Sequence, residues 1–281
     1  MDSAKKIRRK GVFLLPNALT TGALFAGFYS IISGINGQYA AAAIAVVVAG
    51  LLDGLDGRVA RMTNSQSDFG EQYDSLSDMV SFGLAPALLA FNWSLQSLGQ
   101  INPLAGKLGW LAAFVYVACA ALRLARFNAQ AATQDRNYFQ GLSSPAAAGT
   151  LVVTIWFFVD QGISGETVRW LIWLVTISLG VLMFSRVRYY SFKSFPPSGK
   201  VPMAWLFLLM LAFVLLAVDP PTMMLIFAVI YVGSGIVLTL HGRKHSRARR
   251  RLRKRQQQGR ARSAAEAAAD QKVTRPGDKA D

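Results

Sequence analysis

Four aspartates between positions 53 and 78 are the residues of this sequence best suited to chemistry. Asp53 and Asp56 are three residues apart, and Asp74 and Asp78 are four apart, so on helices the members of each pair share a face. Carboxylate oxygens are hard ligands that suit Mg²⁺ or Mn²⁺. Two such ions, bridged by shared carboxylates, form a clamp for displacement at phosphorus. The spacing therefore predicts a metal-dependent site that acts on a phosphate group.

Small residues lie between and around these acids, at Gly54, Gly57, Ala60 and Gly70. Their lack of side-chain bulk leaves room for a large group to lie against the helix backbone. Arg58 and Arg61 follow the first acidic pair and could form ion pairs with phosphate. Acids, small residues and arginines together predict a site for a metal-bound diphosphate.

The elements that must position this site are apolar. The chain has 281 residues, of which 53% are hydrophobic and 16% charged, and this composition fits neither an ordinary soluble domain nor a disordered chain. Apolar runs of bilayer-spanning length recur at about 14–33, 38–60, 75–98, 108–127, 144–159, 168–184, 201–218 and 222–240. We therefore expect an all-α, polytopic membrane bundle of about eight transmembrane helices, with a polar, metal-containing cavity open to the cytoplasm.

Charges on the loops predict the orientation. An even number of spans places both termini on one side, and the basic residues expected on that side are Arg58, Arg61, Arg123, Arg126, Arg136, Arg186, Arg188, Lys193 and Lys200. The opposite loops carry little more than Lys107 and Arg169. Basic loops stay in the cytoplasm, so both termini and the acidic stretch are predicted to face it. This placement fits an integral protein of a bacterial inner membrane.

The C-terminal segment has a different character. Residues 242–281 are dense in Arg, Gln and Ala and show no apolar period, which is typical of a disordered tail. We expect a membrane domain over residues 1–241 and a basic cytoplasmic tail that contacts anionic lipid. Nucleic acid is an unlikely partner, because no aromatic residues are interleaved with the basic ones.

The acidic stretch resembles a known signature. The pattern Asp53-x2-Asp56-Gly57-x2-Ala60-Arg61-x8-Gly70-x3-Asp74-x3-Asp78 is similar at every fixed position to that of the CDP-alcohol phosphatidyltransferase family. The segment LPNALT at 15–20 is also similar to one that opens many of these enzymes. The resemblance implies a helical membrane enzyme, usually a homodimer, that holds two divalent cations, Mg²⁺ or Mn²⁺. It implies that an alcohol attacks a CDP-linked lipid, CDP-diacylglycerol, and that CMP leaves.

The resemblance also implies roles for individual residues. Asp53, Asp56 and Asp74 would be metal ligands, and Asp78 would be both a ligand and the general base. The residues expected to line the nucleotide pocket are Gly57, Ala60, Arg61, Gly70, Asn17 and Thr20. For Asn17 and Thr20 the alternative is that they cap or pack the first helix.

Three further segments, 74–86, 122–128 and 139–149, resemble the branch of the family that uses serine. Serine carries a carboxylate, for which arginine is the natural partner. Arg123 and Arg126 share a helical face, and we expect Arg126 with Asn128, helped by Arg123 and Ser143, to recognise L-serine. The expected reaction therefore gives phosphatidylserine and CMP. Without the resemblance, the two arginines would be interpreted as cytoplasmic anchors of a helix.

Two alternatives remain open. Within the enzyme class, the protein could be a phosphatidylglycerophosphate synthase or use another alcohol, although glycerol phosphate would need a strongly basic pocket. Outside it, intramembrane acids are also found in ion-coupled transporters. A transporter would place its acids in the middle of spans and contain broken helices in paired repeats. Here the acids cluster at one level and no repeat is evident.

Overall fold

A computed structural model of the chain describes residues 2–63, 65, 67–130, 138–185, 188–190, 203–235 and 237. Contacts divide the chain into Met1–Gly235 and Ile236–Asp281, and the description below concerns the first part. The expected tail at 242–281, and the expected domain boundary before it, lie outside the described residues.

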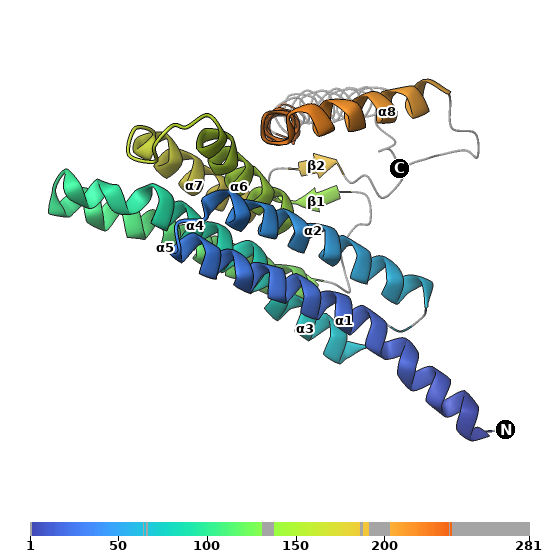
Figure 1. The fold of residues 1–281 in the computed structure, drawn as a ribbon. Helices are drawn as coiled ribbons and strands as arrows, with labels where there is room; N and C mark the ends of the chain where they lie inside the picture. The colour runs from blue at the N-terminus through green and yellow to red at the C-terminus, as the bar shows by residue number, and fades with distance from the viewer. Residues whose placement is uncertain are drawn as a thin grey trace, which may run out of the picture. The chain divides into compact units, whose positions relative to one another are not determined.

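Helices make up most of the described chain (Figure 1). In order they are α1 (Asp2–Ile35), α2 (Tyr39–Met62), α3 (Asp68–Asp78), the π-helical segment η1 (Met79–Leu84), α4 (Ala85–Trp93), the 3₁₀ segment η2 (Leu95–Gln100), α5 (Pro103–Gln130), α6 (Ser144–Asp160), α7 (Arg169–Phe184) and α8 (Met203–Val218). A last helix covers Pro220–Gly235. Two short strands, β1 (Tyr138–Gln140) and β2 (Arg188–Tyr190), pair antiparallel with Tyr138 opposite Tyr190. The expected helical fold is confirmed, and this ladder is an addition that the apolar pattern did not predict.

Three of these helices are long and apolar enough to cross a membrane: Leu15–Ile35, Tyr39–Met62 and Pro103–Ala129. Shorter apolar helices follow at Ser144–Asp160, Arg169–Phe184, Leu206–Val218 and Pro220–Gly235. The run expected at 75–98 is not one continuous α-helix, because η1 and η2 interrupt it on either side of α4. The count of eight spans therefore stays a prediction.

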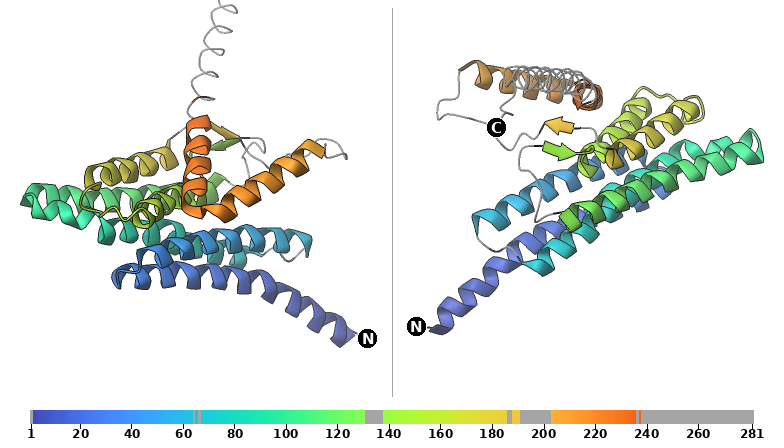
Figure 2. Two further views of the ribbon diagram at one scale, coloured as in Figure 1. Left: turned by 45° about the horizontal axis from the view of Figure 1, so that its top comes forward. Right: turned by 180° about the vertical axis from the view of Figure 1, so that it is seen from behind.

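A glycine turn sets α1 against α2. Gly37 has φ +76°, a conformation that glycine adopts without strain. The N–H of Gln38 donates to the Ser33 carbonyl at 2.8 Å, and the N–H of Gly37 donates to the Gly34 carbonyl at 3.3 Å, which is the pattern of a Schellman C-cap. The chain reverses here, so α1 and α2 run side by side in both views of Figure 2. This hairpin brings the middle of α1 next to the acidic end of α2.

The segment α3–η1–α4 contacts both α1 and α5. Ser67 caps the N-terminus of α3 by accepting a hydrogen bond from the Gly70 N–H at 3.1 Å. Gly27 on α1 allows a close approach to η1, because a Cβ atom there would lie 2.8 Å from the Cα of Ser81. The Ser81 hydroxyl also donates to the Ala23 carbonyl at 3.0 Å. Small residues thus hold α1 directly against the turn that follows Asp78.

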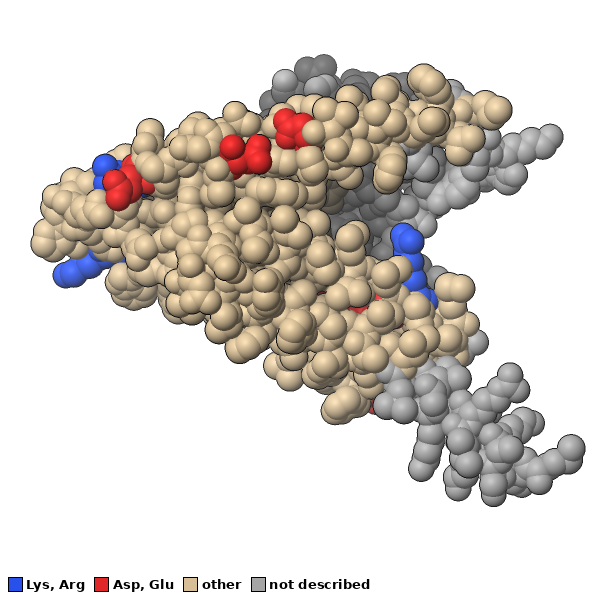
Figure 3. Space-filling view, in the orientation of Figure 1, with Lys and Arg blue, Asp and Glu red and all other residues tan. Residues whose placement is uncertain are grey.

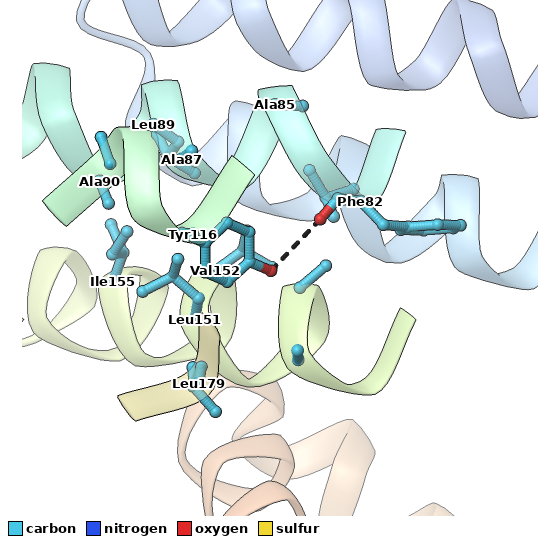
Figure 4. Packing of buried hydrophobic residues seen from close by; sticks show 14 of the residues in the cluster. Phe82, Ala85, Ala87, Leu89, Ala90, Tyr116, Leu151, Val152, Ile155 and Leu179 are labelled. Atoms are coloured by element: carbon cyan, nitrogen blue, oxygen red, sulfur yellow. Dashed lines mark hydrogen bonds between the residues drawn. The ribbon is translucent and has the colours of Figure 1, made fainter. Parts of the chain in front are cut away.

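The core is built largely from small and aliphatic side chains on several helices (Figure 4). Tyr116 on α5 is fully buried, and its hydroxyl donates to the Phe82 carbonyl in η1 at 3.2 Å. Gly180 on α7 allows a second close approach, since a Cβ atom there would lie 3.1 Å from the Cα of Tyr116. Small residues at helix contacts are typical of membrane bundles, in which backbones pack closely.

Large apolar side chains cover much of the described surface. On α1 they are Leu15, Phe25, Phe28, Tyr29, Ile32 and Ile35. Few charged atoms interrupt the described face in Figure 3. So much exposed apolar surface is uncommon on a soluble monomer and suits contact with lipid. Together with the apolar helices, it indicates an integral membrane protein.

Candidate metal and phosphate site

Two helices bring the aspartates together. Asp53 and Asp56 lie near the C-terminal end of α2, and Asp74 lies on α3. Each of the three offers a carboxylate oxygen, and these oxygens all lie within 4.8 Å of one another. Asp78, one turn after Asp74, has its carboxyl hydrogen-bonded with that of Asp53. The four aspartates singled out from spacing therefore form one cluster in space.

Helix α1 supplies a hydrogen bond to this cluster. The hydroxyl of Thr20 lies 2.7 Å from Asp56 Oδ2 and 3.1 Å from the Pro16 carbonyl. A hydroxyl has one proton, and an ionised carboxylate is the stronger acceptor of the two. Ser77 on α3 donates in turn to the Thr20 carbonyl at 3.2 Å. Thr20, which the sequence placed in the nucleotide pocket, thus contacts a candidate metal ligand.

The donor set fits a hard divalent cation. Three carboxylates from two helices converge, and such a group is costly to hold together unless a cation or protons neutralise it. Burial raises the pKa of Asp74 to about 7, and the nearby carboxyls of Asp56, Asp53 and Glu71 add to the effect. All ligand atoms in the cluster are oxygens, as Mg²⁺ and Mn²⁺ prefer. Asp53, Asp56 and Asp74 are the residues that could hold the ion.

The glycines near the acids leave open space. A Cβ atom on Gly54 would meet nothing within 4 Å, and one on Gly57 would meet only Nη1 of Arg61, at 3.7 Å. The Arg61 guanidinium therefore lies beside Gly57, and its part in phosphate binding stays a prediction. Ala60, near the end of α2, has its carbonyl bonded to the Ser65 N–H at 3.0 Å.

Gly70 and Asn17 meet across α3 and α1. A Cβ atom on Gly70 would lie 3.5 Å from Oδ1 of Asn17, an ordinary packing distance, and 3.1 Å from the Ser67 hydroxyl that caps the same helix. The next turn of α1 carries Thr21, whose hydroxyl lies 3.0 Å from the Tyr73 hydroxyl. Asn17 and Thr20 thus lie on the part of α1 that contacts α3, close to the acids.

Arg123 is an expected acceptor-binding residue that interacts with the acids. It is half-buried on α5 and interacts electrostatically with Asp78 and Asp53. Its Nη1 donates to the Ser144 hydroxyl at 2.7 Å, at the start of α6. A guanidinium has five N–H donors, so this bond occupies only part of its fork.

The other expected acceptor-binding residues make contacts at the same end of the helices. Arg126 donates to the Phe184 carbonyl at 3.1 Å and lies over the Phe184 ring. The Asn128 amide donates to the Ser75 hydroxyl at 3.0 Å, next to Asp74. Ser143 caps α6 through the Ala146 N–H. These contacts give each residue a structural role, and their part in recognition stays a prediction.

Two residues that contact the expected acceptor-binding residues were not found from the sequence. Ser144 follows Ser143 directly, but nothing in the sequence shows that it accepts from Arg123. Tyr231, on the last helix, has its side chain hydrogen-bonded with that of Ser143. It is the one tyrosine in the apolar run 222–240, and that was the available signal.

Fold and site together define a helical membrane protein with a carboxylate cluster suited to a divalent cation. The sequence profile of the family described as CDP-alcohol phosphatidyltransferase matches residues 13–182, which include all four aspartates. The chain belongs to this family.

Curated relatives share more than this region. A Helicobacter pylori protein named "CDP-diacylglycerol--serine O-phosphatidyltransferase" is 36% identical over 230 residues, which cover 80% of this chain and 91% of the relative. A Mycobacterium leprae protein of the same name is 34% identical over 193 residues, 66% of this chain and 62% of the relative. The "Archaetidylserine synthase" of Methanothermobacter thermautotrophicus is 38% identical over 177 residues, 62% of this chain and 69% of the relative.

Proposed function

We propose that this protein transfers a phosphatidyl group from CDP-diacylglycerol to the hydroxyl of L-serine and releases CMP. The serine oxygen attacks the phosphorus that carries the diacylglycerol, the bond from that phosphorus to the CMP oxygen breaks, and the hydroxyl proton leaves. The observation that carries the proposal is the convergence of Asp53, Asp56 and Asp74 within 4.8 Å in a chain of this family. The name of the Helicobacter pylori relative, 91% of which aligns with this chain, supports serine as the acceptor.

In this mechanism Asp53, Asp56 and Asp74 would hold two divalent cations, with Asp78 as a further ligand. When bound, such cations neutralise charge on the diphosphate and on the departing CMP. Asp78 also takes the proton of the attacking hydroxyl. A carboxylate is a sufficient base here, because the serine hydroxyl becomes more acidic as its oxygen begins to bond to phosphorus. Thr20 keeps the Asp56 carboxylate oriented through its hydrogen bond.

At the nucleotide end, we assign the open space beside Gly57 to the cytidine diphosphate. Arg61 binds the phosphate oxygens of the nucleotide, and the small side chain of Ala60 leaves room beside the helix. Gly70 and Asn17 border the same region from α3 and α1. The nucleotide is large and fits only where side chains are small, and this explains why small residues lie between the acids.

At the acceptor end, we assign the serine carboxylate to the basic residues of α5. Arg123 and Arg126 supply the positive charge, and Asn128 and Ser143 supply hydrogen bonds. Arg123 interacts with Asp78, so a carboxylate held there would place the serine hydroxyl near the proposed base. An acceptor with a phosphate, such as glycerol phosphate, would bring a larger charge to the same arginines.

We further propose that the protein is a homodimer in a bacterial inner membrane, with both termini and the site on the cytoplasmic side. The excess of basic residues on one set of loops supports this orientation. Labelling of single cysteines placed in the loops by a membrane-impermeant reagent tests it. Reaction of a cysteine at position 107 from outside intact cells, with protection of one at position 61, is the expected result.

The experiment that tests the activity measures CMP release by the full chain in membranes or detergent. CDP-diacylglycerol is supplied with serine, glycerol 3-phosphate or inositol in parallel. We expect release with serine only, its loss on chelation with EDTA, and its return with Mg²⁺ or Mn²⁺. Release with another alcohol alone would contradict serine as the acceptor, and release unaffected by EDTA would contradict the metal.

Substitution of the cluster provides the matched control. Asp53→Asn, Asp56→Asn and Asp74→Asn should each lower the rate of CMP release at least about a hundredfold, since each removes a charged ligand. Asp68→Asn removes the same charge from an exposed position at the start of α3. It should leave the rate within about twofold. Equal effects at Asp68 and Asp74 would contradict the assignment.

A further inference from the structure

The last helix, Pro220–Gly235, lies beyond the residues that the family profile matches. Met224, Leu225, Tyr231 and Val232 pack against the hydrophobic core. Tyr231 is half-buried, and its side chain is hydrogen-bonded with that of Ser143. The ring thus lies in apolar surroundings while the hydroxyl meets a polar group at the start of α6.

The same hydroxyl interacts with Arg123. The Arg123 guanidinium interacts electrostatically with Tyr231 as well as with Asp78, Arg126 and Asp53. Its Nη1 donates to the Ser144 hydroxyl at 2.7 Å, and Ser144 is bonded in sequence to Ser143, the partner of Tyr231. Three elements therefore meet at one arginine: α5 carries it, the start of α6 accepts a hydrogen bond from it, and the last helix supplies a tyrosine that interacts with it.

We propose that Tyr231 is a positioning residue for the acceptor end of the site. Through its contacts with Ser143 and with Arg123, Tyr231 holds the Arg123 guanidinium where this group can receive the carboxylate of an amino-acid acceptor beside Asp78. The proposal rests on the proposed function, because it assigns a role within that site. A guanidinium recognises a carboxylate through two parallel N–H bonds, so its orientation matters as much as its charge. Ser144 accepts from one nitrogen of Arg123, and Tyr231 interacts with the same guanidinium and with the residue that precedes Ser144.

The alternative is that Tyr231 only helps to pack the last helix. Tyr231→Phe separates the two roles, since it keeps the ring and removes the oxygen. With the full chain, we expect the KM for serine to rise about five- to tenfold, the size expected for one lost hydrogen bond. The KM for CDP-diacylglycerol and the melting temperature should change little, because the nucleotide end and the ring packing are intact.

Tyr39→Phe is the matched control. Tyr39 on α2 is also half-buried, and its hydroxyl lies 3.5 Å from the Asn92 carbonyl, on a helix outside the site. It should leave both KM values unchanged. If Tyr231→Phe likewise changes neither KM, or lowers only the melting temperature, or raises both KM values equally, the positioning role is wrong.

A double-mutant cycle tests whether Tyr231 acts through Ser143. If the two hydroxyls work as one unit, adding Ser143→Ala to Tyr231→Phe should raise the serine KM less than the product of the two single effects. Multiplicative effects would overturn the coupling. The wild-type assay distinguishes the two levels of failure: absence of serine-dependent CMP release contradicts the proposed function, whereas an active wild type with an unchanged Tyr231→Phe variant contradicts this inference alone.

Discussion

The hydroxyl of Thr20 lies 2.7 Å from Oδ2 of Asp56, although 36 positions separate the two residues in the chain. This contact ties α1 to the carboxylate cluster of α2 and α3. Asp56 is buried, and a buried carboxylate is retained only where hydrogen bonds or cations offset the loss of water. Thr20 supplies one such bond.

Thr20→Val should weaken the site without disturbing the helix. Valine keeps the shape of threonine and removes the donor, and a hydrogen bond to a charged group contributes about 1.5–3 kcal/mol. We expect the Mn²⁺ or Mg²⁺ concentration for half-maximal CMP release to rise about tenfold or more. Thr176→Val is the control, because the buried Thr176 hydroxyl donates only to a carbonyl of its own helix, Ile172, at 2.7 Å. Equal metal requirements in both variants would contradict the role of Thr20.

Gly57→Ala should affect substrate binding more than folding. An added methyl group would meet only Arg61, at 3.7 Å, so the protein itself has room for it. It would, however, occupy space assigned to the cytidine diphosphate. We expect the KM for CDP-diacylglycerol to rise about tenfold or more while the serine KM and the melting temperature stay near their wild-type values.

Gly149→Ala is the control for that substitution, since Gly149 also lies in a helix, α6, and a methyl group there would meet nothing within 4 Å. Unchanged kinetics are expected. A Gly57→Ala variant with wild-type kinetics would show that the nucleotide lies elsewhere.

Gly27→Ala should lower stability. A Cβ atom at position 27 would lie 2.8 Å from the Cα of Ser81, so α1 and η1 must separate. Overpacking of this kind costs about 1–3 kcal/mol. We expect a lower melting temperature in detergent and a lower rate of CMP release, because η1 follows Asp78 directly.

Gly34→Ala tests the same helix without the clash. Its nearest contact would be Leu89 Cδ1 at 3.6 Å, an ordinary packing distance. Alanine also favours a helix over glycine, so the melting temperature should stay the same or rise. A fall as large as that of Gly27→Ala would mean that loss of any α1 glycine, rather than the contact with Ser81, is responsible.

Cation binding should depend on pH through Asp74. Burial raises the pKa of this carboxyl to about 7, so at lower pH it is protonated and must release its proton when it becomes a ligand. Through Asp74 alone, the affinity for Mn²⁺ is therefore expected to rise about fivefold between about pH 6 and about pH 7, and at most about twofold further above pH 7. Isothermal titration in detergent measures it.

Asp74→Asn is the companion variant. It should bind Mn²⁺ more weakly and lose most of this pH dependence, because the amide does not titrate. An unaltered pH dependence in Asp74→Asn would assign the proton to another group.

Local features of the chain were predictable. The acids pair at helical spacing, most of the apolar runs contain helices, and Gly54 and Gly57 fall where the structure leaves space. These properties depend on residues three or four apart, and helical geometry relates them directly. The signature from Asp53 to Asp78 was also sufficient to identify the family that the comparisons confirm.

Details within helices were less accessible. The run at 75–98 was expected as one span, whereas the structure contains a π-helical segment after Asp78 and a 3₁₀ segment after Trp93. Apolar composition is the same in all three helix types, so composition does not distinguish them. A π segment changes the face that later residues present, and such segments are frequent at functional sites.

Contacts between distant helices were decided only by the tertiary structure. The sequence around Thr20, Arg123 and Tyr231 does not predict which acid or hydroxyl each of them contacts, because those partners depend on the register of one helix against another. Close approaches at glycines such as Gly27 and Gly180 set that register. The sequence alone therefore determined the kind of chemistry, through residue types at helical spacing. The packing of the helices decided which side chains surround it, since distances across a bundle depend on every contact between its helices.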